Sequence, residues 1–368
     1  SYLPNENKIK KYLKKNINMS HSIYDSLTGT EICFITVPTP SLKNGKFSNK
    51  FLIDVLKIIS KFLNKNKRKN PYIININSTV SPGAFDNELI PFMKNEGLKI
   101  NIDYEFIYNP YFVALGDVIK NLESPDFILI GSSSNNSAKK IQSIYKMIYK
   151  NPNFKVMSLR EGELVKLLVN CYVASKISFT NFVKSLTENM ESVSLPTVLN
   201  AIGTDKRIGN NFLRPGGPFL GPCLPRDIVA LSKFCKDIKI NKIYPDSAKK
   251  LNKICINSLL QLINFLKKKK IKSIGFTGIA YKPNTDFYQE SIAFKLMQRA
   301  KKIGLKIYFF DKYIQNKKIN FSRVNSLQSL VKKCDVIFIS YEDNFILKKQ
   351  KIFNRDIYVW DIFNFLSL

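Results

Sequence analysis

Six cysteines could supply a nucleophile, and their surroundings set one of them apart. Five lie in or beside apolar periodic segments, where a cysteine is most often a small buried hydrophobic residue: Cys33, Cys171, Cys235, Cys255 and Cys334. Cys223 lies instead in a loop rich in Gly and Pro, directly before a helical segment and close to Arg226 and Asp227. A helix amino terminus or a nearby cation favours the reactive thiolate. The spacing alone leaves two interpretations of Cys223 open, a nucleophile and an ordinary loop thiol.

A second candidate group lies on one predicted helix, in the segment EGELVKLLVN. Glu163, Lys166 and Asn170 are three and four residues apart, so they share one helical face. A polar stripe of this kind is usually solvated. However, asparagine is a poor helix former, and the neighbours of Asn170 are apolar. A lysine and an amide that face a cleft could stabilise a developing oxyanion.

Three predicted strands end in residues suited to binding a ligand. The residues are Val37, Pro38 and Thr39 after the first strand, and Ser78 and Thr79 after the second. In an open parallel sheet, ligands bind beyond the carboxyl ends of the strands, so these hydroxyls and loop amides could hold a cofactor or a water. Lys282 follows a strand later in the chain and is suited to contact a phosphate, although an ordinary turn explains it as well.

The rest of the composition excludes several kinds of site. The chain has a single histidine, His21, which disfavours Ser-His-Asp and Cys-His catalysis. The cysteines show no C-x-x-C spacing, and six in 368 residues do not make a disulfide scaffold. We therefore expect no metal site and a reducing, cytoplasmic location.

The elements that must position these residues alternate between strand and helix. Apolar, β-branched runs predict strands buried on both faces, near 31–38, 72–80, 103–108 and 126–131. Helical spacing predicts helices at 51–68, 84–95 and 135–150. From Ile271 the alternation resumes with the strand segments KSIGFTGIAY, KIYFFD, CDVIFIS and DIYVWD. The pattern predicts an α/β fold with doubly wound parallel sheets.

The middle of the chain is helical instead. Helices are expected at 162–190, 193–204 and 227–268, and the Gly- and Pro-rich loop 207–227 cannot be regular structure. We therefore divide the chain into three domains, 1–153, 154–264 and 265–368. The central one contains the Cys223 loop and a long connecting helix.

The net charge suggests a different class of protein. Lys and Arg number 58 against 28 Asp and Glu, which gives +30 and invites a polyanion-binding function. The lysines are, however, spread along the chain among Asn and Ile, and A/T-rich codons would produce the same composition. No nucleic-acid-binding motif, signal peptide or apolar run of about 18 residues is present in the sequence. We expect neither a nucleic acid nor a membrane as partner.

In their order along the chain, five segments resemble the motifs of the UDP-glucose/GDP-mannose dehydrogenase family. They are VPTP, STVSPG, EGELVKLLVNCYVASKISFTN, RIGNNFLRPGGPFLGPCLPRD and GIAYKPNTDFYQES. The resemblance extends over essentially the whole chain. It implies an incomplete Rossmann-like NAD domain, a helical middle domain that forms a dimer, and a second Rossmann-like domain that binds the UDP sugar.

The resemblance also implies a reaction: oxidation of C6 of a nucleotide sugar, of the UDP-hexose type, from alcohol to carboxylate with two NAD molecules, for polysaccharide precursor synthesis. Cys223 would attack the aldehyde intermediate to give a thiohemiacetal and then a thioester. Lys166 and Asn170 would stabilise the oxyanion, and Asp227 and Thr79 would orient or activate the hydrolytic water.

The same resemblance assigns the binding residues. Those for NAD are Val37, Pro38, Thr39, Ser78 and Thr79. Those for the nucleotide-sugar substrate are Arg207, Asn211, Gly217, Gly221 and Lys282. Arg207 resembles an arginine that reaches into the site of a neighbouring subunit, which implies a homodimer built on the long middle helix.

The sequence departs from the family pattern at several places. No G-x-G-x-x-G occurs, the first glycine is Gly29, and the chain begins at Ser1. Our hypothesis is that the first βαβ unit of the NAD domain is missing from this sequence and present in its parent protein. The isolated chain would then expose a sheet edge and be poorly soluble.

Four substitutions bear on activity. Tyr111 and Leu115 stand where the family usually has glutamates, one of them a proposed acid/base for thioester hydrolysis. Gln289 and Phe363 stand where arginines are common. A non-catalytic homologue that binds a nucleotide sugar, or an inactive fragment, is therefore the alternative to an active dehydrogenase.

Overall fold

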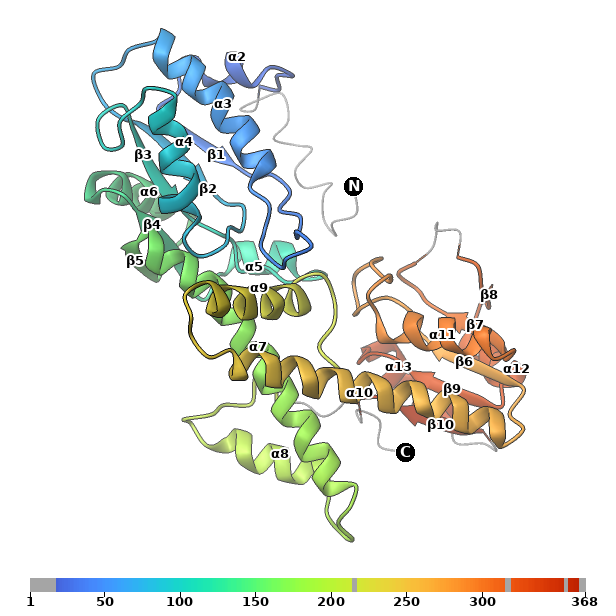
Figure 1. The fold of residues 1–368 in the computed structure, drawn as a ribbon. Helices are drawn as coiled ribbons and strands as arrows, with labels where there is room; N and C mark the ends of the chain where they lie inside the picture. The colour runs from blue at the N-terminus through green and yellow to red at the C-terminus, as the bar shows by residue number, and fades with distance from the viewer. Residues whose placement is uncertain (1–17, 214–216, 315–318, 354–356, 364–368) are drawn as a thin grey trace. The chain divides into compact units, whose positions relative to one another are not determined.

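The computed structural model describes residues 18–213, 217–314, 319–353 and 357–363 (Figure 1). These residues form two compact units. The first contains the described residues up to Val169 together with Val229–Asn241. The second contains Asn170–Ile228 and the described residues from Lys242 onward. The division into three domains is not tested by this result and stays a prediction.

The first unit is built on a five-stranded sheet in the order β1-β2-β3-β4-β5. The strands are β1 (Ile32–Ile35), β2 (Tyr72–Ile76), β3 (Tyr104–Tyr108), β4 (Ile128–Ser132) and β5 (Phe154–Ser158). The first three strands are parallel to one another, and β4 is parallel to β5. The α/β class is confirmed.

One pairing in this sheet differs from the predicted parallel arrangement. Strands β3 and β4 are antiparallel, with Ile107 opposite Ser132 and Tyr108 opposite Gly131. The connection between them contains only the short helix α5 (Val118–Glu123), which has no buried residue. A parallel pair needs a crossover packed against the sheet, and α5 does not provide one.

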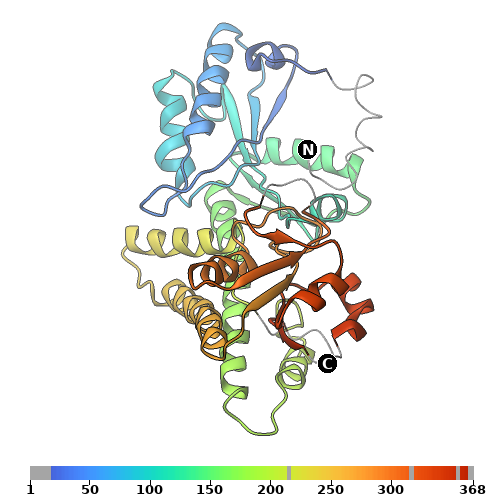
Figure 2. The same cartoon turned by 90° about the vertical axis from the view of Figure 1, so that its right-hand side faces the viewer.

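Helices cover both faces of this sheet, as Figure 2 shows. They are α2 (Ile23–Leu27), α3 (Lys50–Lys65), the π-helical turn η1 (Phe85–Leu89), α4 (Ile90–Asn95) and α6 (Asn135–Ile148). Alternate residues of β2 join different cores: Tyr72 and Ile74 pack with residues of α3 and α4, whereas Ile73 packs with residues of α6. Burial on both faces explains why the strand sequences are continuously apolar.

The strand β1 is an exception to the predicted burial. It pairs with β2 alone among the described strands, so it lies at one edge of the described sheet. Phe34 is 45% exposed, and only Ile35 of the four strand residues is buried. The prediction that the segment 31–38 is buried on both faces is wrong, because β1 is covered fully on neither side.

The second unit contains a parallel sheet in the order β10-β9-β6-β7-β8. Its strands are β6 (Ser273–Thr277), β7 (Lys306–Phe310), β8 (Ser322–Arg323), β9 (Val336–Ile339) and β10 (Tyr358–Asp361). Its helices are α11 (Ile292–Lys302), α12 (Leu327–Lys333), α13 (Asn344–Lys348) and the 3-10 turn η2 (Gln350–Phe353). The four strands predicted here are confirmed, and the two-residue β8 was not predicted.

Four helices form the middle of the chain: α7 (Leu159–Thr187), α8 (Leu195–Thr204), α9 (Leu224–Asp237) and α10 (Ile243–Lys268). The described residues of 207–223 contain no helix or strand, as expected, while 214–216 lie outside the description. The single helix predicted at 227–268 is wrong. Lys239 has φ 59, and the amide of Ile240 donates back to the carbonyl of Cys235, a geometry that ends a helix.

Candidate active site

The loops that follow β1 and β2 are tied together by side-chain hydrogen bonds. The hydroxyl of Ser78 accepts from the amide of Val37 at 2.7 Å and donates to the carbonyl of Val37 at 2.8 Å. The hydroxyl of Thr39 donates to the carbonyl of Thr79 at 3.0 Å. The structure therefore brings together the residues predicted to bind the cofactor, and Pro38 is exposed between the two tethered positions.

Thr79 remains available to a ligand. Its hydroxyl has no hydrogen-bond partner among the described residues, and its side chain is half-buried at the carboxyl end of β2. This location suits a contact with a nicotinamide cofactor, since ligands bind beyond the strand ends of an open sheet. The assignment of Val37–Thr39 and Ser78–Thr79 to an NAD site stays a prediction. The pyrophosphate turn is not among the motifs of the chain.

Glu163 contacts the loop after β2 and does not lie on a solvated face. It is fully buried, and its two carboxylate oxygens accept from the amides of Gly83 at 2.6 Å and Phe85 at 2.9 Å. Burial raises the pKa of the Glu163 carboxyl from 4.5 to about 7, because desolvation outweighs these two hydrogen bonds. Glu163 therefore fixes the loop after β2 to helix α7.

Lys166, one turn further along α7, is also buried, at 8% exposure. Its ammonium donates to the carbonyl of Tyr111 at 2.7 Å and lies 4.4 Å from the ring centroid of Phe112. Both contacts fix the position of the ammonium group. The predicted oxyanion-stabilising cation thus lies against the segment that carries the two substituted glutamate positions.

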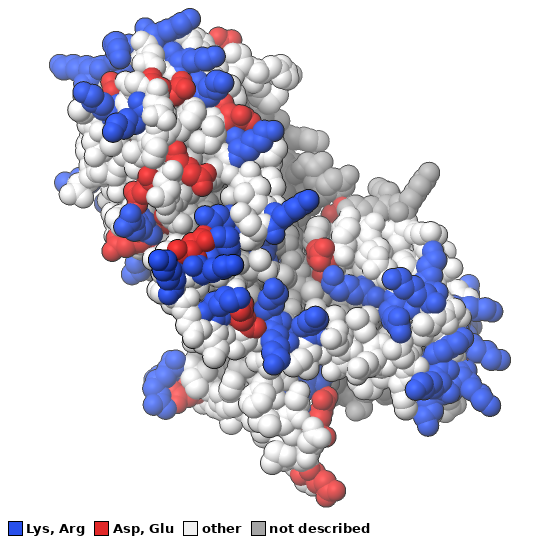
Figure 3. All heavy atoms as spheres, viewed as in Figure 1, with Lys and Arg blue, Asp and Glu red and all other residues white. Residues whose placement is uncertain are grey.

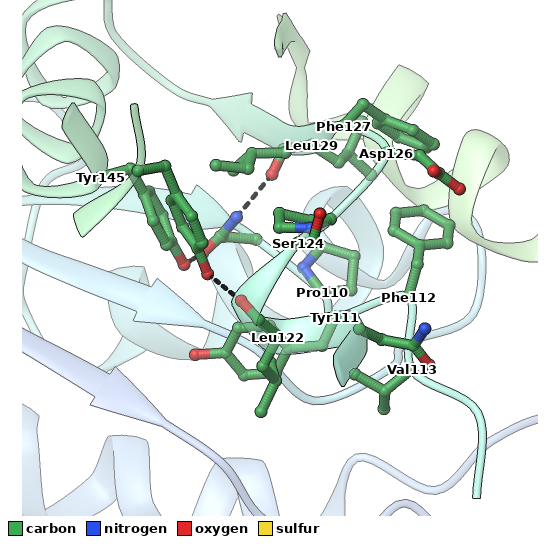
Figure 4. A pocket seen from close by; sticks show the side chains of 15 residues that line it. Pro110, Tyr111, Phe112, Val113, Leu122, Ser124, Asp126, Phe127, Leu129 and Tyr145 are labelled. Carbon is green, nitrogen blue, oxygen red and sulfur yellow. Dashed lines mark hydrogen bonds between the residues drawn. The ribbon is translucent and has the colours of Figure 1, made fainter. Parts of the chain in front are cut away.

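That segment encloses a small cavity, shown in Figure 4. Tyr111, which is 39% exposed, and Phe112 line it together with Asn109 and Tyr145. The cavity volume of about 100 Å³ admits a few water molecules but no nucleotide sugar. Leu115 is half-buried in the same segment and does not line the cavity.

Asp227 is the centre of the second candidate cluster. Its side chain is buried, and it accepts from the amide of Asn170 at 2.6 Å and from the guanidinium of Arg226 at 3.1 Å. The thiol of Cys171 donates to the carbonyl of Asp227 at 3.5 Å. The structure joins the side chains of Asn170 and Asp227, which are 57 residues apart in sequence.

Cys223 lies directly before α9. Its carbonyl accepts the first helical hydrogen bond, from the amide of Asp227 at 2.9 Å. All six cysteines are unbridged, and Cys223 alone among them is exposed. The two thiols Cys33 and Cys334 have pKa values raised to about 12 by burial and are inert by comparison. The location thus matches the predicted exposed thiol at a helix amino terminus.

Buried amides hold the loop that leads to Cys223. Asn181 of α7 donates to the carbonyl of Gly217 at 3.2 Å, and Asn252 of α10 donates to the carbonyl of Phe219 at 2.9 Å. The ring of Phe363 packs so closely on Gly217 that a Cβ there would lie 2.6 Å from it. The sequence analysis missed Asn181 and Asn252, although an asparagine in an apolar helix was the signal that singled out Asn170.

Of the other predicted substrate residues, three are exposed or half-buried, and Gly221 is buried. The side chain of Arg207 is 88% exposed and forms a salt bridge with Asp205 at 2.6 Å. Asn211 is exposed, and Lys282 is half-buried after β6. At Gly221, φ is +82°, and a Cβ would lie 2.6 Å from the ring of Tyr281. Only glycine combines that backbone with that close contact.

The described residues contain neither a metal-binding cluster nor a membrane-spanning helix. No group of three or more His, Cys, Asp or Glu side chains is arranged to hold a metal ion there. Within the same residues, no helix has the length and apolar character to cross a membrane.

Comparison with known proteins decides the family. The chain matches profiles of the UDP-glucose/GDP-mannose dehydrogenase family: the NAD binding domain over 4–149, the central domain over 160–254 and the UDP binding domain over 275–367. It is 30% identical to the UDP-glucose 6-dehydrogenase of Rickettsia prowazekii (strain Madrid E), over 92% of this chain and 78% of that protein. The chain belongs to this family. The resemblance seen in the sequence is confirmed, and so is NAD as the family's cofactor.

Other members of the family show the same architecture. The chain is 24% identical to the GDP-mannose 6-dehydrogenase of Pseudomonas putida, over 83% of this chain and 69% of that protein. Its fold matches a UDP-glucose dehydrogenase from Pyrobaculum islandicum with a TM-score of 0.82, at 24% identity over 93% of this chain and 78% of that one. The structural match confirms the fold class, and the class of NAD-dependent oxidoreductase rests on the family profiles and the Rickettsia relative.

Proposed function

We propose that this chain is an NAD-dependent dehydrogenase that oxidises C6 of a UDP-hexose from the alcohol to the carboxylate. The observation that carries the proposal is the exposed thiol of Cys223 at the start of α9, one turn before the buried Asp227. The UDP binding domain over 275–367 supports a nucleotide sugar as substrate. We further propose that the product serves polysaccharide precursor synthesis in a reducing cytoplasm.

In the proposed reaction the thiol of Cys223 adds to the C6 aldehyde and forms a thiohemiacetal. Loss of a hydride from C6 then leaves a thioester, and water attack releases the carboxylate and regenerates the thiol. NAD, held by the loops after β1 and β2, would supply the hydride acceptor for two oxidations, alcohol to aldehyde and thiohemiacetal to thioester. One alcohol, one water and two NAD⁺ would then yield one carboxylate, two NADH and three protons.

The surrounding residues would stabilise charge on the substrate oxygen and bind the attacking water. Lys166 and the Asn170 amide would stabilise negative charge on the C6 oxygen. Asn170 would have to leave Asp227 to do so, and the carboxylate of Asp227 would then be open to a water, as would the hydroxyl of Thr79.

The test is NADH production from a panel of UDP- and GDP-sugars. We expect Cys223→Ala to abolish acid formation, and Cys235→Ala, a thiol further along α9, to retain it. Appreciable acid from Cys223→Ala would exclude the covalent mechanism. Nucleotide-sugar binding without NADH from any sugar in the panel would instead identify the non-catalytic homologue.

We also propose that the protein is a homodimer built on α7 and α10. Phe182 of α7 and Ile254 and Phe265 of α10 are exposed and line one groove of about 500 Å³. An exposed apolar groove between two long helices is typical of a protein interface. The exposed Arg207 is then available to the site of the second subunit. Ile254→Asp should yield monomers in light scattering, and an unchanged mass would exclude this interface.

A further inference from the structure

The fold gathers lysines that the sequence keeps apart. Ten exposed lysines of the carboxy-terminal part stand at the carboxyl ends of helices or the amino ends of strands: Lys267, Lys268, Lys269, Lys270, Lys272, Lys301, Lys302, Lys306, Lys332 and Lys333. We name this set the basic pole. In sequence these lysines span 67 positions: five lie within 267–272, and the other five lie in the separate segments 301–306 and 332–333, so no single short window contains all ten.

The topology explains why they meet. The helices α10, α11 and α12 each precede a parallel strand, so all three end at the edge where β6, β7 and β9 begin. Lys306 pairs with Ser273 across β7 and β6, and its amide donates to the carbonyl of Lys272. The amide of Asp335, just before β9, donates to the carbonyl of Ser273. These contacts place the ends side by side.

The pole is nearly free of opposing charge. Asp335 is the one acid of the described segments that make it up, and its carboxylate accepts from the amides of Lys272 and Ser273. None of the ten lysines forms a salt bridge with a described acid, whereas Lys295 and Lys312 elsewhere in the unit do. Figure 3 shows the resulting concentration of lysine over the ends of α10 and α12.

The acids of this sheet domain lie toward the opposite edge. They follow the strands or precede the helices: Asp286, Glu290, Asp311, Glu342, Asp343 and Asp361. Compensation of the helix dipole favours a cation in the last turn of each helix, but it does not explain Lys272 and Lys306, which stand at the starts of strands. Charge is therefore separated across the domain. Lys282, which is predicted to bind the nucleotide sugar, follows β6 at the acidic edge.

We propose that the basic pole is a surface for reversible binding to an anionic lipid bilayer. The exposed cations of the pole are lysines, whereas Arg299, also in the last turn of α11, is half-buried and donates to the side chain of Asn264 at 2.9 Å. Lysine lacks the planar fork with which arginine reads phosphates and bases. Flexible ammonium groups spread over the ends of several helices suit a fluid, laterally mobile layer of anionic headgroups. This revises the expectation, drawn from the dispersed lysines of the sequence, that a membrane is no partner.

The experiment is sedimentation of the full chain with vesicles of phosphatidylcholine alone or mixed with phosphatidylglycerol. The pole variant is Lys301→Gln/Lys302→Gln/Lys332→Gln/Lys333→Gln. The control, Lys57→Gln/Lys61→Gln/Lys65→Gln/Lys67→Gln, removes the same charge from exposed positions on and just after α3. A second pole variant, with Lys267 to Lys270 changed to Gln, serves if the first fails to fold by circular dichroism.

We expect binding to the mixed vesicles alone, lost at about 1 M salt, where the Debye length is roughly 3 Å. The pole variant should bind at least about tenfold more weakly, and the control within about twofold of the unmodified chain. Equal losses in the two variants would show that net charge acts without the pole and would overturn the proposal. Tighter binding to a homopolymeric RNA than to the mixed vesicles, at equal phosphate concentration, would also overturn it.

Discussion

Replacing Glu163 by glutamine should remove the fall in stability of the first unit that occurs as pH rises from about 4.5 to about 7. The side chain is fully buried, and burial raises its pKa to about 7 from the ordinary 4.5. Asp86, whose carboxylate binds Arg160 at 2.6 Å, adds a smaller repulsion. The folded protein therefore prefers neutral Glu163, and ionising it in place costs free energy.

The direction of the change in stability with pH follows from the number of protons bound in the folded and unfolded states. Between pH 4.5 and about 7 the folded state retains a proton that the unfolded state has lost, so stability falls as pH rises through this window. A pKa difference of this size corresponds to about 3 kcal/mol, at roughly 1.4 kcal/mol per pKa unit. Glutamine does not titrate, but its NH2 group must face one of the two backbone amides that donate to Glu163, which costs about 1–3 kcal/mol at every pH. Relative to the unmodified protein, the variant should therefore start from a lower stability near pH 4.5 and gain up to about 3 kcal/mol between pH 4.5 and pH 8.

The assay is urea unfolding followed by circular dichroism across this pH range. The single tryptophan, Trp360, lies in β10 of the second unit, so its fluorescence supplies an internal control that Glu163 should not affect. Glu161→Gln is a matched control on the same helix. Hydrogen bonds from Ser158 lower the pKa of Glu161, so its contribution is lost as pH falls, the opposite direction. A Glu163→Gln variant that is less stable by the same amount at pH 5 and pH 8 would refute the reasoning.

Three further outcomes are expected. In unfolding followed by tryptophan fluorescence, Gly278→Ala should destabilise the second unit by about 1–3 kcal/mol more than Gly304→Ala. Both glycines have positive φ, but only at Gly278 would a Cβ meet a ring, that of the buried Tyr341, at 2.3 Å. Asp227→Asn should lower the free energy of unfolding by about 1–3 kcal/mol in the same assay. It removes the ion pair with Arg226 and turns the new NH2 group toward a donor, Asn170 or Arg226. An unchanged free energy of unfolding would mean that this cluster does not stabilise the fold. Mass-mapped alkylation at neutral pH should modify Cys223 before Cys33 and Cys334, whose pKa values are raised, and the reverse order would contradict the exposure of Cys223.

Structural features that depend on a single segment of the chain were predicted correctly from the sequence. The Gly- and Pro-rich loop predicted an exposed Cys223 before a helix, and the structure places its carbonyl at the first hydrogen bond of α9. The apolar runs predicted β2 and β3, which are buried on both faces. These features depend on residues that are neighbours in sequence, so the pattern contains the physical cause.

The shared helical face of Glu163, Lys166 and Asn170 shows where local reasoning ends. The spacing predicts that they point the same way, but each meets a different neighbour: a loop amide pair, the carbonyl of Tyr111 and the carboxylate of Asp227. A helix advances 5.4 Å per turn, so one face passes several partners. Which partners those are depends on contacts between residues far apart in sequence.

The sequence by itself determined the family, the reacting thiol as a candidate and most of the strands, because each rests on residue types at short spacing. Only the tertiary structure decided that β3 and β4 run antiparallel, that Asn181 and Asn252 hold the Cys223 loop, and that Glu163 is a buried tether. The charge of +30 shows the same division. Its size is a sum over residues, whereas its concentration at one edge of a parallel sheet exists only because the strands share a direction.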